Sequence, residues 1–209
     1  MRIVIPLYER FTALDAVGPY EVLSRLPGAS VVFAASSPRS VRTDTGSLAL
    51  VADAAFAEID ACEVLVVPGG PGSRDAVLDP ALVAWVQALH QTTDWTTSVC
   101  TGSEILGAAG LLRGIEATTH WSRVDALESF GATYTARRVV VQGRVVTAAG
   151  VSAGIDMALT LAALIAGSDV AKAIQLGIEY DPQPPFAAGS VVAAGPAIVE
   201  LVRGGAATR

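Results

Sequence analysis

The sequence predicts a three-layer α/β/α sandwich, with a mainly parallel sheet and a few antiparallel additions. Short apolar segments alternate with longer helical patterns, and several segments are apolar at consecutive positions, as in strands covered on both faces. Of the 209 residues, 52% are hydrophobic and 16% charged, which excludes a disordered chain. A chain of this size buries about 70% of its unfolded surface and needs no metal or disulfide for stability.

The strands and helices follow one another along the chain. We expect strands at Ile3–Tyr8, Ser30–Ala35, Val64–Pro68, Thr96–Val99 and Val145–Ala149. We expect helices at Leu14–Leu26, Pro80–Gln91, Gly102–Leu112, Ser122–Phe130, Ala153–Ala166 and Asp169–Ile178. Asp79 before Pro80 is a typical helix start, and Gly46 and Gln142-Gly143 predict hairpin turns.

The last part of the chain has a different composition. No linker is evident before about residue 179, where Glu179–Phe186 carries three prolines that favour an extended path. Pro196–Val202 predicts one more helix. We therefore expect a single domain over residues 1–209, in which residues 179–209 form a C-terminal strap and helix.

Charge and cysteine content exclude several functions. Fourteen Lys and Arg against twenty Asp and Glu give a net charge of -6 without a basic stripe, which argues against a nucleic-acid partner. Two cysteines and two histidines, with no C-x-x-C pair, argue against a zinc site. The most apolar segment, Met157–Gly167, is too short to span a membrane, and no signal peptide is evident. We expect a cytoplasmic protein that binds no membrane.

The strongest chemical signal is Cys100, at the junction between a predicted strand and a predicted helix. Such an elbow exposes the side chain and directs the helix N–H groups toward it, which favours the thiolate. The alternative is a small buried hydrophobic residue, the usual state of a free cysteine. We prefer the functional interpretation for Cys100 and the buried one for Cys62, which precedes a strand.

Three further segments supply candidate partners. Pro68-Gly69-Gly70 leaves a strand as a glycine-rich turn, and the Gly70 and Thr101 N–H groups are candidate oxyanion donors; a tight turn without function stays open. Asp15 follows the first strand at the edge where α/β sheets bind ligands, although a helix N-cap is the commoner role. His120, beside Trp121, is either a wall residue or a base.

Together these motifs resemble the ThiJ/PfpI superfamily of flavodoxin-like domains, and within it the isocyanide hydratases. The resemblance extends from Ile3 to Gly189. Its motifs are Leu14-Asp15 with Gly18-Pro19, Pro68-Gly69-Gly70, Ser98–Ser103, Gly107–Leu112, Ala117–Trp121, Ala153–Asp156, and Glu179-Tyr180 before Pro184-Pro185-Phe186.

Three departures separate the chain from other branches. Thr101 stands where peptidase-like members have histidine, and Asp15 where stress-response and glyoxalase-type members have glutamate. The chain shows no helix-turn-helix pair, unlike the transcription-regulator branch. Pro71 departs from the pattern of the isocyanide hydratases themselves, which leaves the detailed geometry of that loop open.

The resemblance implies that a small isocyanide is hydrated to an N-substituted formamide without metal or redox cofactor. Cys100 would add as thiolate to give a thioimidate, with Asp15 as general acid and base. Gly70 and Thr101 would stabilise charge, while Thr101 and Ser103 fix Asp15 or water. His120 would border the substrate, beside an apolar wall that includes Trp121.

The resemblance also implies a homodimer, in which the proline-rich strap clasps the partner. Two other functions of the same superfamily stay open. One is a cofactor-free lyase of the glyoxalase or deglycase type, and the other is a non-enzymatic sensor in which Cys100 oxidises to a sulfinate. Formation of formamide, compared with formation of lactate from methylglyoxal, separates the first of these from hydration.

Overall fold

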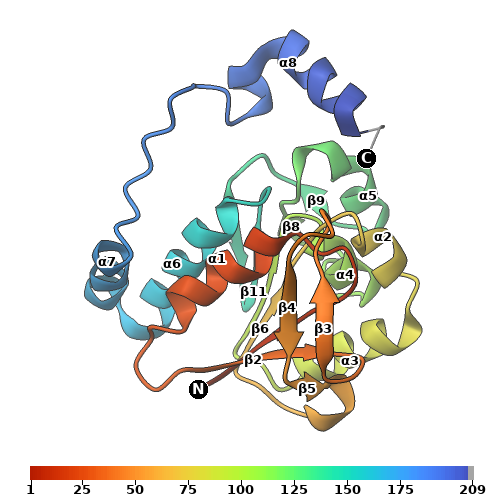
Figure 1. Cartoon of the computed structure of the whole chain (residues 1–209), viewed down its shortest axis with the longest axis vertical. Helices are drawn as coiled ribbons and strands as arrows, with labels where there is room; N and C mark the ends of the chain where they lie inside the picture. Colours follow the sequence, from red (N-terminus) through yellow and green to blue (C-terminus); the bar gives the residue numbers. More distant parts are fainter. Residues whose placement is uncertain (207–209) are drawn as a thin grey trace. The chain divides into compact units, whose positions relative to one another are not determined.

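The computed structural model, which describes residues 1–206, contains a central seven-stranded sheet in the order β10-β11-β7-β6-β1-β2-β5 (Figure 1). Neighbouring strands are parallel except for the antiparallel pair β10–β11. The strands are β1 (Arg2–Pro6), β2 (Ser30–Ala35), β5 (Ala54–Ala55), β6 (Val64–Val67), β7 (Trp95–Val99), β10 (Val139–Gln142) and β11 (Val145–Ala148). The predicted mainly parallel sheet is confirmed.

Helices cover both faces of the sheet. On one face α1 (Ala13–Leu23) packs against α6 (Ala153–Ala166), which in turn contacts α7 (Ser168–Gly177). The other face carries α2 (Ser73–Ala76), α3 (Pro80–His90), α4 (Gly102–Ala108) and α5 (Val124–Ser129). All four residues of β6 are buried, as expected for a strand between two helical layers. The three-layer prediction is confirmed.

The smaller elements lie outside the main sheet. An antiparallel hairpin joins β3 (Arg39–Arg42) to β4 (Ala49–Ala52), with Gly46 in its turn at a φ of +74°. The short strands β8 (Glu116–Ala117) and β9 (Thr133–Tyr134) pair in parallel, and η1 (Phe56–Glu58) and η2 (Trp121–Arg123) are single 3-10 turns. The sequence predicted neither β8–β9 nor β5, because strands of two residues are too short to show a period.

Two compact units make up the chain, Met1–Ile178 and Glu179–Arg209. In the second unit an exposed segment without regular structure leads into α8 (Val191–Ala206). That helix includes the predicted Pro196–Val202 segment and is interrupted at Gly195, whose φ of +74° is not helical. In the described part of the chain, no helix combines the length and the apolar character that crossing a membrane requires.

The order of the strands has a switch point at β1. After β1 the chain first builds β2 on one side and then returns to place β6 on the other side. Loops that leave the carboxyl ends of β1 and β6 therefore diverge, which opens the space where parallel α/β sheets bind ligands. The loops after β1, β6, β7 and β11 all meet at this edge.

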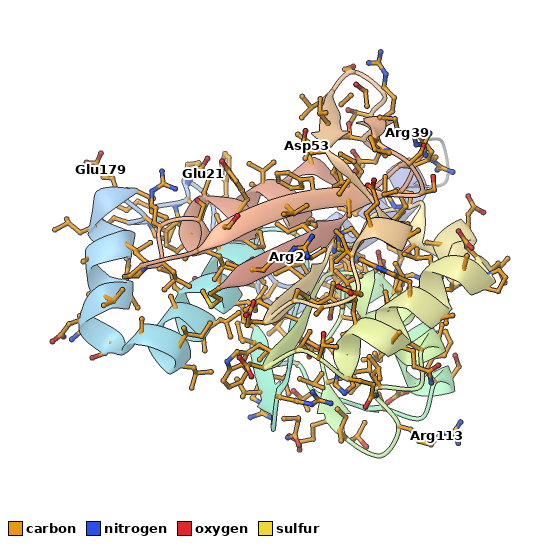
Figure 2. The ribbon with its side chains drawn as sticks, turned by 90° about the horizontal axis from the view of Figure 1, so that it is seen from below. Arg2, Glu21, Arg39, Asp53, Arg113 and Glu179 are labelled. Atoms are coloured by element: carbon orange, nitrogen blue, oxygen red, sulfur yellow. The ribbon has the colours of Figure 1, made fainter. Side chains whose placement is uncertain are left out.

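Charged side chains are mostly kept away from the interior. In Figure 2 the labelled Glu21, Arg39 and Arg113 lie on the outside of the fold, and each is exposed. Two carboxylates are different, because Asp15 is 0% exposed and Glu104 is 2% exposed. A buried carboxylate is costly unless it is paired or protonated, so both residues need an explanation.

Candidate active site

Cys100 occupies the elbow, the junction Val99–Gly102 between β7 and α4. Its φ is +56°, a left-handed conformation that is uncommon for a residue with a side chain. The backbone is held there because the Cys100 N–H donates to the carbonyl of Ala149 at 2.9 Å and is also 3.1 Å from that of Ala148. The predicted strand–cysteine–helix junction is thus present, and its backbone is strained at Cys100.

Two hydroxyl groups hold the elbow by hydrogen bonds to its backbone. Ser103 Oγ donates to the Cys100 carbonyl at 3.0 Å, and Thr119 Oγ1 donates to the same oxygen at 3.1 Å. Ser103 therefore fixes the backbone of Cys100, instead of Asp15 or water as expected. Thr119, which the sequence did not single out, ties the segment after β8 to the elbow.

Asp15 lies in the first turn of α1, beside the cysteine. The N-cap of that helix is Thr12, so the N-cap alternative for Asp15 is wrong. Asp15 Oδ2 accepts a hydrogen bond from the Gly69 N–H at 3.0 Å, whereas Oδ1 has no partner within residues 1–206. A buried carboxyl oxygen without a partner is rare in a folded protein and indicates a functional site.

Burial raises the pKa of Asp15 from 3.8 to about 7. The Gly69 N–H and a hydrogen bond with the Cys100 side chain oppose this rise, and the nearby charge of Asp44 adds to it. Thr12 Oγ1 holds Asp44 in place, donating to its Oδ2 at 2.7 Å. Asp15 therefore exchanges its proton close to neutral pH, the range in which a general acid and base works best.

The glycine-rich loop Pro68–Gly72 fits tightly between the loop after β1 and the elbow. Gly70 has a φ of +137°, and a Cβ there would lie 2.5 Å from the Thr12 nitrogen. A Cβ on Gly69 would lie 2.5 Å from the Thr101 nitrogen. Only glycine fits at these positions, because a Cβ would clash with the backbone of the loop after β1 and of the elbow.

The hydrogen bonds of this loop differ from those expected. The Gly70 N–H donates to Thr101 Oγ1 at 2.8 Å, and Thr101 Oγ1 donates back to the Gly70 carbonyl at 3.0 Å. The Gly70 N–H is thus occupied and is not a free oxyanion donor in this structure. Thr101 joins the loop to the elbow through its hydroxyl group, and the Gly69 N–H is the one that faces Asp15.

The electrostatic environment of the Cys100 sulfur also differs from the expectation of a stabilised thiolate. Burial and then the charge of Asp15 raise the pKa of the thiol above its ordinary value, and backbone hydrogen bonds from Val151 and Thr101 only partly offset this rise. The first turn of a helix of seven residues does not compensate for a sulfur that is 5% exposed. At neutral pH the proton therefore rests on sulfur, beside the carboxyl group of Asp15.

Val151 is a contributor that the sequence did not reveal. It follows β11, and its backbone has a φ of +27°, an outlier for a β-branched residue. That conformation accompanies the hydrogen bond from its backbone to the Cys100 side chain. Nothing in the amino-acid type signals this conformation, because valine normally avoids it.

His120 and Trp121 border the site from the loop after β8. His120 Nδ1 lies 2.8 Å from Ser122 Oγ, and burial lowers the pKa of the imidazole below its ordinary value. The ring packs on Gly150, where a Cβ would be 2.7 Å from His120 Cδ2. The centroid of the Trp121 ring lies 5.4 Å from that of the His120 ring. His120 therefore packs as a neutral imidazole against Gly150, the residue before Val151.

Tyr8 completes the buried surroundings. Its hydroxyl group donates to the Pro68 carbonyl at 2.7 Å. Burial raises the pKa of the phenol well above its ordinary value, and the charges of Asp15, Cys100 and Glu104 raise it further. Within residues 1–206, no group of three or more His, Cys, Asp or Glu side chains is arranged to hold a metal ion.

Comparisons with known proteins identify the relatives of this chain. A model of the DJ-1/PfpI family matches residues 1–164. Over 197 residues the chain is 41% identical to an isonitrile hydratase of Pseudomonas putida, covering 94% of this chain and 86% of that protein.

Solved structures give the same result. A ThiJ/PfpI family protein from Pseudomonas syringae is 42% identical with a TM-score of 0.92, covering 97% of this chain and 84% of that chain. DJ-1beta of Drosophila melanogaster, at 20% identity and a TM-score of 0.77, shares the fold over 85% of this chain and 97% of its own.

Proposed function

The chain belongs to the DJ-1/PfpI family, and from that premise we propose that it is an isocyanide hydratase. The observation that carries the proposal is the buried pair of Asp15 and Cys100. The pKa of that carboxyl group is raised by burial to about 7 beside a strained elbow cysteine. Identity of 41% to an isonitrile hydratase over 94% of the chain supports the same activity.

The first half of the reaction needs a nucleophile and a proton at one carbon atom. Asp15 as carboxylate takes the thiol proton while Cys100 Sγ bonds to the terminal carbon of the isocyanide. Asp15 delivers that proton to the same carbon as the carbon–sulfur bond forms, so no free carbanion forms. The product is a thioimidate, in which the carbon carries one hydrogen, the sulfur and a double bond to nitrogen.

The second half hydrolyses the thioimidate. Asp15 removes one proton from a water molecule as the water oxygen attacks the thioimidate carbon, and the second proton of that water moves from the oxygen to the nitrogen. Collapse of the tetrahedral carbon expels the Cys100 sulfur, which takes back the proton from Asp15. One isocyanide and one water thus give one N-substituted formamide, and both side chains return to their starting states.

The surrounding backbone supports these steps. The hydrogen bonds from Thr101 and Val151 to the Cys100 side chain stabilise negative charge on sulfur while the thiol proton is leaving. The Gly69 N–H keeps the Asp15 carboxyl group oriented toward the sulfur. Thr101 and Ser103 act by fixing the loop and the elbow, and His120 and Trp121 form the wall against the substrate.

We further propose that the protein is a cytoplasmic homodimer. Both cysteines are free, and the reaction needs Cys100 as a thiol, which suits a reducing compartment. The second unit exposes large apolar side chains, among them Phe186, Val192 and Leu201, which favours burial against another copy. Light scattering of the purified protein tests the dimer, and a monomeric mass would contradict it.

An assay with a simple aryl isocyanide tests the activity. We expect stoichiometric N-aryl formamide from the wild type, the same rate from Cys62→Ser, and no product from Cys100→Ala. Lactate from methylglyoxal without any formamide would instead establish a lyase of the glyoxalase type. A protein that turns over neither compound while Cys100 oxidises reversibly would be a sensor.

A further inference from the structure

Glu104 is a buried carboxylate that the proposed reaction does not use. It lies in the first turn of α4, four residues after Cys100, and its side chain is 2% exposed. Arg123 neutralises it, donating from Nε to Oε1 at 2.7 Å and from Nη2 to Oε2 at 3.1 Å. The arginine side chain itself is 30% exposed. This two-bond pairing fixes the guanidinium group in both distance and rotation.

The pair connects the helix behind the nucleophile to the wall in front of it. Arg123 ends η2, two residues after Trp121 in the wall formed by His120 and Trp121. On the other side of these two residues, Thr119 Oγ1 donates to the Cys100 carbonyl at 3.1 Å. The wall is therefore attached on both sides to the element that carries the nucleophile, once through the elbow and once through Glu104.

A buried ion pair of this kind contributes more to the orientation of the residues around it than to the stability of the fold. Two well-packed apolar side chains commonly stabilise a fold as well as a buried ion pair does, because the pair must first lose its hydration. The paired ions restrict geometry in a way that apolar contacts do not, since each hydrogen bond has a direction. The position of His120 against Gly150 is narrow enough for such a restriction to matter.

We propose that Glu104 and Arg123 are positioning residues that hold the His120–Trp121 wall beside Cys100 and thereby determine the size of the substrates that reach the sulfur. The statement about substrates rests on the proposed hydration of isocyanides. The statement about the wall does not, because it concerns access to a thiol.

Arg123→Lys is the most informative single substitution, because lysine keeps the charge but replaces the planar fork by a single point of contact. For a bulky aryl isocyanide we expect KM to rise by about tenfold while kcat stays within about threefold, since the wall is displaced and the Asp15–Cys100 pair is not. Glu104→Gln, which keeps the shape and loses the charge, should act in the same direction. Arg25→Lys, in the exposed pair with Glu21, is the matched control and should change neither constant.

A second readout does not require hydration. In a Cys62→Ser background only Cys100 remains to react, so its alkylation by small iodoacetamide and by a bulky N-aryl maleimide can be compared. We expect Arg123→Lys to change the ratio of the two rates by at least about threefold, because loss of the fork alters access more than reactivity. If the wild type hydrates no isocyanide, the proposed function fails, but this ratio of alkylation rates still tests whether Glu104 and Arg123 position the wall.

The double variant Glu104→Leu/Arg123→Leu separates positioning from stability, because it leaves no buried charge unpaired and should remain folded. We expect it to show the raised KM and the altered alkylation ratio of Arg123→Lys. A folded double variant with wild-type KM and wild-type alkylation ratio would overturn the proposal, since the pair would then contribute only to packing.

Discussion

The two ends of strand β7 differ in how completely their polar groups are hydrogen-bonded. At the amino end, Thr96 Oγ1 lies 2.8 Å from His90 Nδ1 and 2.7 Å from Thr93 Oγ1, so three buried or half-buried polar groups satisfy one another. At the carboxyl end, Cys100 has a φ of +56° and the neighbouring Asp15 Oδ1 has no partner among residues 1–206. One strand thus joins a relaxed, fully paired network to a strained, incompletely paired one.

The difference indicates where the fold stores stability and where it holds reactivity. Strained backbone and unpaired buried groups persist only where the surrounding structure enforces them, and they cluster at functional sites. The two cysteines follow the same division, because Cys62 precedes β6 at the relaxed end whereas Cys100 follows β7 at the strained end. Substitutions at the two ends should therefore separate loss of activity from loss of stability.

The largest effect is expected at Cys100. Cys100→Ala should reduce formamide formation to the uncatalysed background, because the other cysteine, Cys62, lies at the opposite end of the sheet, while the urea midpoint stays near that of the wild type. Cys62→Ser is the matched control and should retain the rate. A large loss of rate in Cys62→Ser would mean that the reactive end of the sheet is wrongly assigned.

Asp15→Asn comes next. Asparagine has the same shape but neither releases nor accepts a proton at neutral pH, so the rate should fall by roughly 10²–10⁴-fold. Asp15→Glu keeps the carboxyl group with a longer reach and should retain a partial rate. Near-normal turnover by a folded Asp15→Asn protein would remove the proton-transfer role and leave His120 as the next candidate acid.

The pH dependence of stability follows from the same residue. Burial raises the pKa of Asp15 from 3.8 in a free side chain to about 7 in the folded state, so the folded protein binds a proton that the unfolded chain has released. The Asp15 contribution is therefore favourable below pH 4 and is lost as pH rises from about 4 to 7, by roughly 4 kcal/mol or less. The unfolding free energies of the wild type and of Asp15→Asn, measured by urea unfolding at several pH values in this range, should therefore change with pH at different rates. Equal pH dependence in the two proteins would contradict the raised pKa.

The smallest effect is expected at the relaxed end. Thr96→Val keeps the shape of the side chain but leaves His90 Nδ1 and Thr93 Oγ1 without their shared partner, which should cost about 1–3 kcal/mol of unfolding free energy. The hydration rate should stay within about twofold, because a hydrogen-bond change at the far end of a strand leaves the catalytic geometry intact. A folded Thr96→Val protein with a rate as low as that of Asp15→Asn would break the division between the two ends.

Elements with a strong local signal were predictable from the sequence. Asp79 before Pro80 marks the start of α3, and the side chain of Asp79 accepts from the Ala81 N–H at 2.9 Å. The predicted helix Ala153–Ala166 is confirmed with the same bounds, since its apolar pattern ends at Gly167. The helix after the elbow ends at Ala108, four residues before the predicted Leu112. Gly107 and Gly110 weaken helical propensity there.

The arrangement within the site was only partly predictable. A cysteine between strand and helix and an acid after the first strand are visible in the chain, and the structure brings Cys100 and Asp15 together. Which backbone N–H faces which group depends on packing between loops, so Gly69 and not Gly70 contacts Asp15. Glu104 had a signal, because a charged residue in a buried helix turn needs a partner, but a sequence does not identify Arg123 as that partner.

The most direct test of the account is the intact mass of the protein after rapid mixing with a simple isocyanide and quenching in acid. We expect a transient adduct that equals the full mass of one isocyanide and that peptide mapping locates on Cys100. This adduct should be absent from Cys100→Ala and strongly delayed in Asp15→Asn. Formamide production at the wild-type rate with no such adduct, or with the adduct on Cys62, would contradict the covalent role of Cys100.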